Sequence, residues 1–223
     1  MISQKGGAGK TTMTINLAVA AGMDGKTSAI IDIDPQASAA EWGDQRDAEN
    51  PVIISSQPSR LPHVMQEAKE QGVEVLFIDT APHSEKSALD AARAADTVII
   101  PTRAAILDLL AISKTIDLIK IAKADAFVAL NAVPPRGSLS GEAKEVVNAQ
   151  GLEIAPVLSY RHAFFHSLTA GQGVIEYEPE GKAAEEVAQL YLYTCQHVGI
   201  PTDLEAIIRS TENAEENLIS VGA

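Results

Sequence analysis

Residues 5 to 12 read Lys-Gly-Gly-Ala-Gly-Lys-Thr-Thr and lead into a helix-compatible run from Met13 to Ala21. Glycines at this spacing let backbone N–H groups turn inward around phosphate oxygens, and the start of a helix adds the positive end of its dipole. Lys10 would reach the β- and γ-phosphates of a nucleotide, and the Thr11 hydroxyl would ligate Mg²⁺. The segment therefore predicts a phosphate-binding loop, or P-loop, formed by Gly6, Gly7, Ala8, Gly9, Lys10, Thr11 and Thr12.

Two acidic motifs follow, each at the end of an apolar run. The first is Asp32-Ile33-Asp34-Pro35-Gln36. Side chains two residues apart on a strand share one face, so a carboxylate here could orient a water molecule that attacks a phosphate. An Asp-Pro turn that merely ends a strand is the alternative interpretation. The second motif runs from Val75 to Asp79, and Asp79 would hold a water on Mg²⁺ or accept a hydrogen bond from Thr11.

The elements that must position these residues alternate between strands and helices. Short apolar runs predict strands at Ser28 to Ile33, Val52 to Ser55, Val73 to Ile78, Thr97 to Ile100, Ala126 to Leu130 and Ile154 to Leu158. The stretches between them carry apolar residues at helical spacing, such as Leu107, Leu110, Ile112, Ile116 and Ile119. This order predicts an α/β fold with a doubly wound, mainly parallel sheet and helices on both faces, which binds ligands at the carboxyl ends of its strands.

The first expected strand, Met1 to Gln4, is unusually short. Either it is abbreviated, or residues upstream of it are missing from this start. At the other end, an amphipathic helix is expected at about Lys182 to Val198. We expect one P-loop domain at residues 1–200, with residues 201–223 as an acidic helix or tail of the same domain.

Composition limits the possible functions. The 223 residues are 46% hydrophobic and only 4% aromatic, which suits one α/β core. A net charge of −13 excludes a surface that attracts nucleic acid everywhere, so DNA binding would need a local basic patch. Cys195 is the only cysteine, and no apolar run approaches the length of a bilayer span, so a cytoplasmic protein is expected. The candidates for a DNA patch are Arg103, Arg136, Lys144, Arg161 and Lys182.

The P-loop departs from the general pattern at Gln4, where a glycine is usual, and Lys5 follows it. This form, together with the Asp34 and Asp79 motifs, resembles the ParA/MinD family of deviant Walker A ATPases, and most of all its small ParA (ParF-like) partition ATPases. The resemblance implies a P-loop NTPase fold and hydrolysis of ATP with Mg²⁺. It implies catalytic roles for Lys5, Lys10 and Asp34, with Lys5 reaching the nucleotide of a partner subunit in a homodimer. Thr11, Asp34 and Asp79 would serve the metal, and Asp32 would give support.

Further implications of the resemblance concern the base and the cargo. The segment from Asn131 to Pro134 would touch the adenine, since an Asn amide offers both a donor and an acceptor, although a strand-end turn is the alternative for Asn131. A small ParA protein would segregate plasmid or chromosomal DNA, bound to nucleoid DNA without sequence preference and triggered by a ParB-type DNA-binding adaptor. The alternative is a ParA-like scaffold that positions a non-DNA cargo on the nucleoid.

Two related functions are disfavoured by the residues. A membrane-cycling ATPase of the MinD kind would need a basic amphipathic helix at its end, and Arg209 is the only basic residue after Thr202. We therefore expect no membrane partner. An iron–sulfur relative would need several cysteines to hold a cluster, which this chain lacks.

Overall fold

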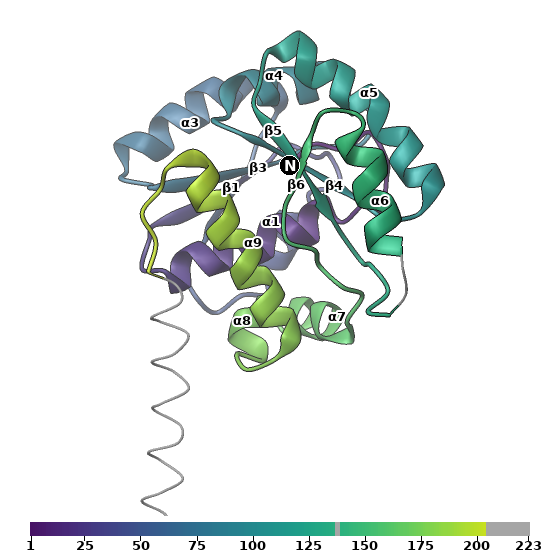
Figure 1. Ribbon diagram of the computed structural model, residues 1–223. Helices are drawn as coiled ribbons and strands as arrows, with labels where there is room; N and C mark the ends of the chain where they lie inside the picture. Colours follow the sequence, from purple (N-terminus) through teal and green to yellow (C-terminus); the bar gives the residue numbers. More distant parts are fainter. Residues whose placement is uncertain (137–138, 204–223) are drawn as a thin grey trace, which may run out of the picture.

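A computed structural model describes residues 1–136 and 139–203. Every strand pair in it is parallel, in the orders β2-β1-β3 and β4-β5-β6. The strands are β1 (Ser28–Asp32), β2 (Val52–Ser55), β3 (Val75–Asp79), β4 (Val98–Thr102), β5 (Ala126–Leu130) and β6 (Glu153–Ile154). The predicted α/β fold is confirmed, because strands and helices alternate along the chain and helices flank the sheet on both sides (Figure 1).

The N-terminal residues lie between the two three-stranded sheets, at the centre of the strands in Figure 1. The Met1 amino group donates to the Ile78 carbonyl of β3 at 2.7 Å, and the Ile2 N–H donates to the Ile99 carbonyl of β4 at 3.0 Å. The Thr80 hydroxyl donates to the Met1 carbonyl. Residues 1–3 therefore take the place of the short strand expected at Met1 to Gln4, although they do not form a regular strand.

Helices cover both faces of the sheet (Figure 1). One layer is centred on α1 (Lys10–Met23). It also contains α2 (Ser38–Gly43), α7 (His162–Thr169), α8 (Val174–Tyr177) and α9 (Lys182–Val198). The other comprises α3 (Leu61–Glu70), α4 (Glu85–Ala94), α5 (Ile106–Ala122) and α6 (Leu139–Asn148), with the short 3₁₀ turn η1 (Pro58–Arg60) before α3. Each layer buries one hydrophobic core against the strands.

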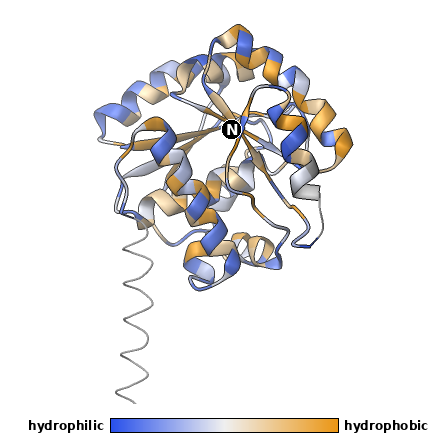
Figure 2. Cartoon of the chain, viewed as in Figure 1, coloured by the Kyte–Doolittle hydropathy of each residue, from blue (hydrophilic) through white to orange (hydrophobic). Residues whose placement is uncertain are grey.

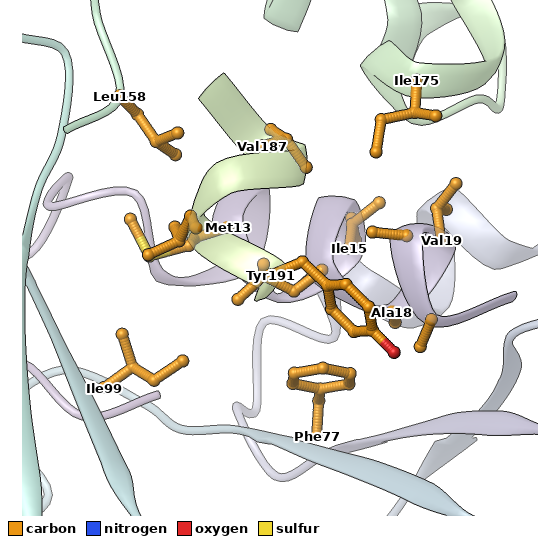
Figure 3. Close-up of a cluster of buried hydrophobic side chains, with 14 of the residues drawn as sticks. Met13, Ile15, Ala18, Val19, Phe77, Ile99, Leu158, Ile175, Val187 and Tyr191 are labelled. Carbon is orange, nitrogen blue, oxygen red and sulfur yellow. The ribbon is translucent and has the colours of Figure 1, made fainter. Parts of the chain in front are cut away.

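Successive strand residues enter opposite cores, because side chains alternate across a strand. In β1, Ile30 belongs to the core under α1 and α9, and Ile31 belongs to the core under α3 to α6. The strands are accordingly mainly apolar, while the helices mix apolar and polar faces (Figure 2). In the first core, Phe77 of β3 lies near Tyr191 of α9, with α1 residues around them (Figure 3). This packing holds the start of α1, and with it the P-loop, against the sheet.

Several predicted boundaries differ from the observed ones. The strand expected at Ile154 to Leu158 is only Glu153–Ile154, because the chain after it pairs at single points, such as the bridge between Val133 and Ser159. In α5, the apolar residues at helical spacing do not all face the core, because the exposed fractions of Leu107 and Leu110 are 72% and 59%. The last helix is confirmed at Lys182–Val198.

The expected acidic tail lies largely outside the described residues, which end at Asp203. Up to that point the chain stays attached to the domain, because the Asp203 N–H donates to Asp24 at 2.8 Å. Within the described ranges, no helix combines the length and the apolarity that crossing a membrane requires.

Candidate nucleotide-binding site

The P-loop has the geometry that its glycines predict. Gly9 has φ 93°, a left-handed conformation, and a Cβ at this position would lie only 1.8 Å from the Asn131 amide nitrogen. Only glycine fits both constraints. Helix α1 begins at the next residue, Lys10, so the loop ends at a helix N-terminus with its free N–H groups.

Lys10 is buried at the start of α1. Burial lowers the pKa of its ammonium group, and the charges of Asp79 and Asp34 act in the opposite direction. A buried lysine facing two carboxylates at a helix N-terminus can place a point charge on bound phosphates.

Thr11 and Asp79 form the part of the site that fits Mg²⁺. The Thr11 hydroxyl donates to Asp79 Oδ2 at 2.6 Å. The other carboxylate oxygen, Oδ1, is buried and accepts no hydrogen bond from the described residues. Burial is also the main reason why the pKa of Asp79 is raised. Mg²⁺ prefers oxygen ligands and keeps several waters, so a metal-bound water suits this oxygen and would compensate the buried charge.

The Asp32 and Asp34 carboxylates have separate tasks. Strand β1 ends at Asp32, whose buried carboxylate accepts from the N–H groups of Asp34 and Ala39 at 3.0 Å and of Ala40 at 3.3 Å. Asp32 therefore ties the loop after β1 to the start of α2. Burial still raises its pKa, despite these hydrogen bonds. Asp34 is half-buried in the loop, and among the described residues its carboxylate accepts only from the Gln36 N–H, at Oδ1. The other carboxylate oxygen is therefore left for a metal-bound or attacking water.

Asn131 contacts the P-loop itself. Its amide nitrogen donates to the Ala8 carbonyl at 2.9 Å, and its amide oxygen accepts from the Ala132 N–H. The side chain thus holds the loop at the position where Gly9 leaves room for it. Pro134 is exposed after β5. The predicted adenine contacts of Asn131 and Pro134 stay predictions.

The connection from β4 to α5 forms the other lip of the loop. Lys5 makes an ion pair with Asp108 in the first turn of α5, and the Lys5 side chain is 46% exposed. A Cβ at Gly7 would lie 3.6 Å from a guanidinium nitrogen of Arg103. Arg103 was expected in a DNA patch, and no sequence signal linked it to the P-loop.

Three residues around the site have a left-handed backbone without being glycine: Ala37 (φ 51°), His83 (φ 60°) and Ala132 (φ 51°). They follow β1, β3 and β5, the strands that carry Asp32, Asp79 and Asn131 at or next to their ends. Such backbone strain gathers at functional loops. Alanine gives no hint of it, so the sequence does not reveal the conformation of Ala37 or Ala132.

Several polar and aromatic residues elsewhere in the domain have structural contacts. Arg161, a second candidate for the DNA patch, pairs with Glu186 at 2.6 Å. Trp42 is buried, with the Arg46 guanidinium 5.2 Å from its ring centroid. No group of His, Cys, Asp and Glu side chains in the described part of the chain could hold a metal ion by itself, and His162 and His166 only lie near each other.

Comparisons with known proteins agree with this geometry. The model of the CobQ/CobB/MinD/ParA nucleotide binding domain matches residues 1–174. Among solved structures, the septum site-determining protein MinD with Mg-ADP from Pyrococcus horikoshii has a TM-score of 0.70 at 21% identity, covering 89% of this chain and 95% of its own. An ATP complex of McdA from Cyanothece has a TM-score of 0.69 at 16% identity, covering 91% and 96%. A ParA family ATPase from Chlorobium tepidum has a TM-score of 0.65 at 16% identity, covering 86% and 95%.

A search of curated protein sequences finds no match. At these identities the solved structures establish the fold, whereas the family model spans most of the chain, including the P-loop and both acidic motifs. The chain therefore belongs to the CobQ/CobB/MinD/ParA family of nucleotide-binding domains.

Proposed function

We propose that this protein is a positioning ATPase that dimerises around Mg-ATP, binds DNA in that state and releases it after slow hydrolysis. The observation that carries the proposal is Lys5. Its ammonium group lies at the outer lip of the P-loop on a side chain that is 46% exposed, with only the Asp108 carboxylate as a partner among the described residues. A cation at this position can leave Asp108 for the phosphates of a second subunit.

An exposed apolar surface next to Lys5 supports a second copy of the chain as the occupant. Ile106, Leu107 and Leu110 lie in the first turns of α5 and are all more than half exposed, on either side of Asp108. Water-exposed apolar side chains in contact with a charged active-site rim are typical of surfaces that become buried on association. The same surface would thus close over the P-loop when two copies meet.

The catalytic groups suit slow turnover. Bound Mg²⁺ would supply positive charge to the β- and γ-phosphates, with Thr11 and Asp79 on its protein side. Lys10 adds a second charge, and Asp34 would orient the attacking water. Asp34 is half-buried in a loop that also contains the strained Ala37, so a partner protein at this loop could alter the hydrolysis rate.

We propose that the ATP-bound dimer binds DNA and that a ParB-type adaptor is its protein partner. Arg136, Lys144 and Lys182 remain exposed, whereas Arg161 is held by Glu186. With a net charge of −13, a single copy has few cations to offer, so binding would require the doubled patch of a dimer and would be sensitive to salt. We propose a cytoplasmic, nucleoid-associated location on the same grounds.

The test combines light scattering with DNA retardation. The protein with Mg²⁺ and a non-hydrolysable ATP analogue should be a dimer that retards arbitrary duplex DNA at low salt, and the retardation should disappear as salt rises. With Mg-ADP the protein should be a monomer that does not bind DNA. Dimers that do not bind DNA at any salt concentration would instead favour the alternative function, a scaffold that positions a protein cargo. A protein that stays monomeric with the analogue would refute the dimer itself.

A further inference from the structure

Arg103 lies where it can act on a bound nucleotide. It directly follows β4, which ends at Thr102, and its guanidinium group lies against the P-loop at Gly7. The nearest guanidinium nitrogen is 3.6 Å from the place that a Cβ of Gly7 would occupy. Within residues 1–136 and 139–203, the guanidinium group has neither a hydrogen bond nor an ion pair.

Residues at the ends of the neighbouring strands also contact the P-loop. Asp79 at the end of β3 accepts from Thr11, and Asn131 after β5 donates to Ala8. Arg103 follows β4, which pairs with β5 on one side and contacts Ile2 on the other. Each of these strand ends therefore sends one side chain to a different part of the P-loop. Asp79 and Asn131 meet protein atoms there, whereas Arg103 presents its donors to solvent above the loop.

The charges of the loop support a phosphate as the partner of Arg103. Lys10 is buried and faces Asp79 and Asp34, and Lys5 is paired with Asp108. Mg²⁺ leaves an ATP molecule with about two negative charges, which are concentrated on the terminal phosphates. A guanidinium group matches phosphate oxygens with two parallel N–H donors and cannot lose its charge near neutral pH.

We propose that Arg103 stabilises the negative charge that develops on the γ-phosphate of ATP during hydrolysis, through an interaction made chiefly in the transition state. In that step the water oxygen bonds to the γ-phosphorus while the bond to the β,γ-bridging oxygen breaks. The electron pair stays on the β-phosphate of ADP, and the proton of the water passes to the released phosphate. The inference rests on the assignment of Mg-ATP to this loop. It replaces the earlier interpretation of Arg103 as a DNA contact.

The experiment compares Arg103→Ala and Arg103→Lys with the wild type, and Arg93→Ala is the matched control. Arg93 is an exposed arginine in the last turn of α4, so it precedes the start of β4, at the opposite end of the strand from Arg103. Single-turnover hydrolysis with Mg-ATP gives the rate, titration gives the affinity, and thermal unfolding tests the fold.

Arg103→Ala should hydrolyse ATP at least ~10-fold more slowly, with affinity for Mg-ATP within ~3-fold of wild type and an unchanged melting temperature. Arg103→Lys should recover part of the rate, because it keeps the charge but loses the planar fork. Arg93→Ala should match the wild type. A wild-type rate in Arg103→Ala, or equal losses of rate and affinity, would overturn the inference. Failure of the wild type to bind Mg-ATP would instead refute the assignment of the loop.

Discussion

Asp32 and Asp34 lie two residues apart, and replacing each with alanine should separate a structural from a catalytic carboxylate. Asp32→Ala removes an acceptor of three backbone hydrogen bonds, from Asp34, Ala39 and Ala40, at a site with no solvent exposure. Each such bond to a charged group contributes about 1.5–3 kcal/mol, but burial of the charge, visible in the raised pKa of Asp32, offsets much of the sum. We expect a net loss of about 3 kcal/mol in the free energy of unfolding.

Asp34→Ala should differ in both stability and activity. It removes one exposed hydrogen bond, from the Gln36 N–H, so the free energy of unfolding should fall by no more than about 0.5 kcal/mol. ATP affinity should stay within ~3-fold of wild type while hydrolysis slows by at least ~100-fold, the pattern of an interaction made in the transition state.

The assay is urea unfolding of the free protein, combined with ATP titration and steady-state hydrolysis. With an m-value of about 2 kcal/mol per molar urea, the unfolding midpoint of Asp32→Ala should drop by about 1.5 M. Asp47→Ala is the control, because Asp47 is an exposed carboxylate on the segment between α2 and β2 and its removal changes the net charge equally. If Asp34→Ala is destabilised as much as Asp32→Ala, or hydrolyses ATP at the wild-type rate, the assignment of the two carboxylates is wrong.

Three further predictions concern the loop and its metal site. Lys10→Ala should lose measurable Mg-ATP binding by calorimetric titration, and unchanged affinity would contradict the P-loop assignment. Burial raises the pKa of Asp79 above its ordinary value of 3.8, so the folded state holds this proton more tightly and loses stability as pH rises above that value. Asp79→Asn should therefore gain in melting temperature relative to the metal-free wild type as the pH rises above 3.8, while losing Mg²⁺-dependent stabilisation by ATP. A difference in melting temperature between the two proteins that shrinks as the pH rises would contradict the raised pKa. Lys5→Ala should bind ATP but stay monomeric by light scattering with a non-hydrolysable analogue, and Asp108→Asn, which frees Lys5, should dimerise at least as well as the wild type.

Much of the site follows from residue pattern alone. An apolar run that ends in an acid, placed next to another in a parallel sheet, brings two carboxylates to one edge, and Asp32 and Asp79 indeed lie in register on β1 and β3. The P-loop follows from glycine spacing because its backbone geometry admits few other residues.

Other parts of the site depend on contacts between distant segments. The roles of Asp32 and Asn131 depend on where the strained loops at Ala37 and Ala132 turn, and alanine carries no signal for a positive φ. Arg103 was assigned to a DNA-binding surface patch, because the sequence around an exposed arginine does not indicate which loop lies beside it. In α5, apolar residues surround much of the helix, so the spacing could not separate the core face from the exposed Leu107 and Leu110.

The two three-stranded halves of the sheet meet at residues 1–3, and we call this boundary the seam. The two halves are joined through residues 1–3 by a few hydrogen bonds, including those of Met1 with Ile78 and of Ile2 with Ile99. Asp79 belongs to one half, whereas Arg103 and Asn131 belong to the other, and the P-loop continues directly from the seam. A nucleotide in the loop would therefore interact with both halves of the sheet, at the boundary where few hydrogen bonds join them. The rate of amide hydrogen exchange at Ile2 reports on opening of this boundary. Slower exchange with Mg-ATP would measure how much the ligand stabilises the contact between the two halves.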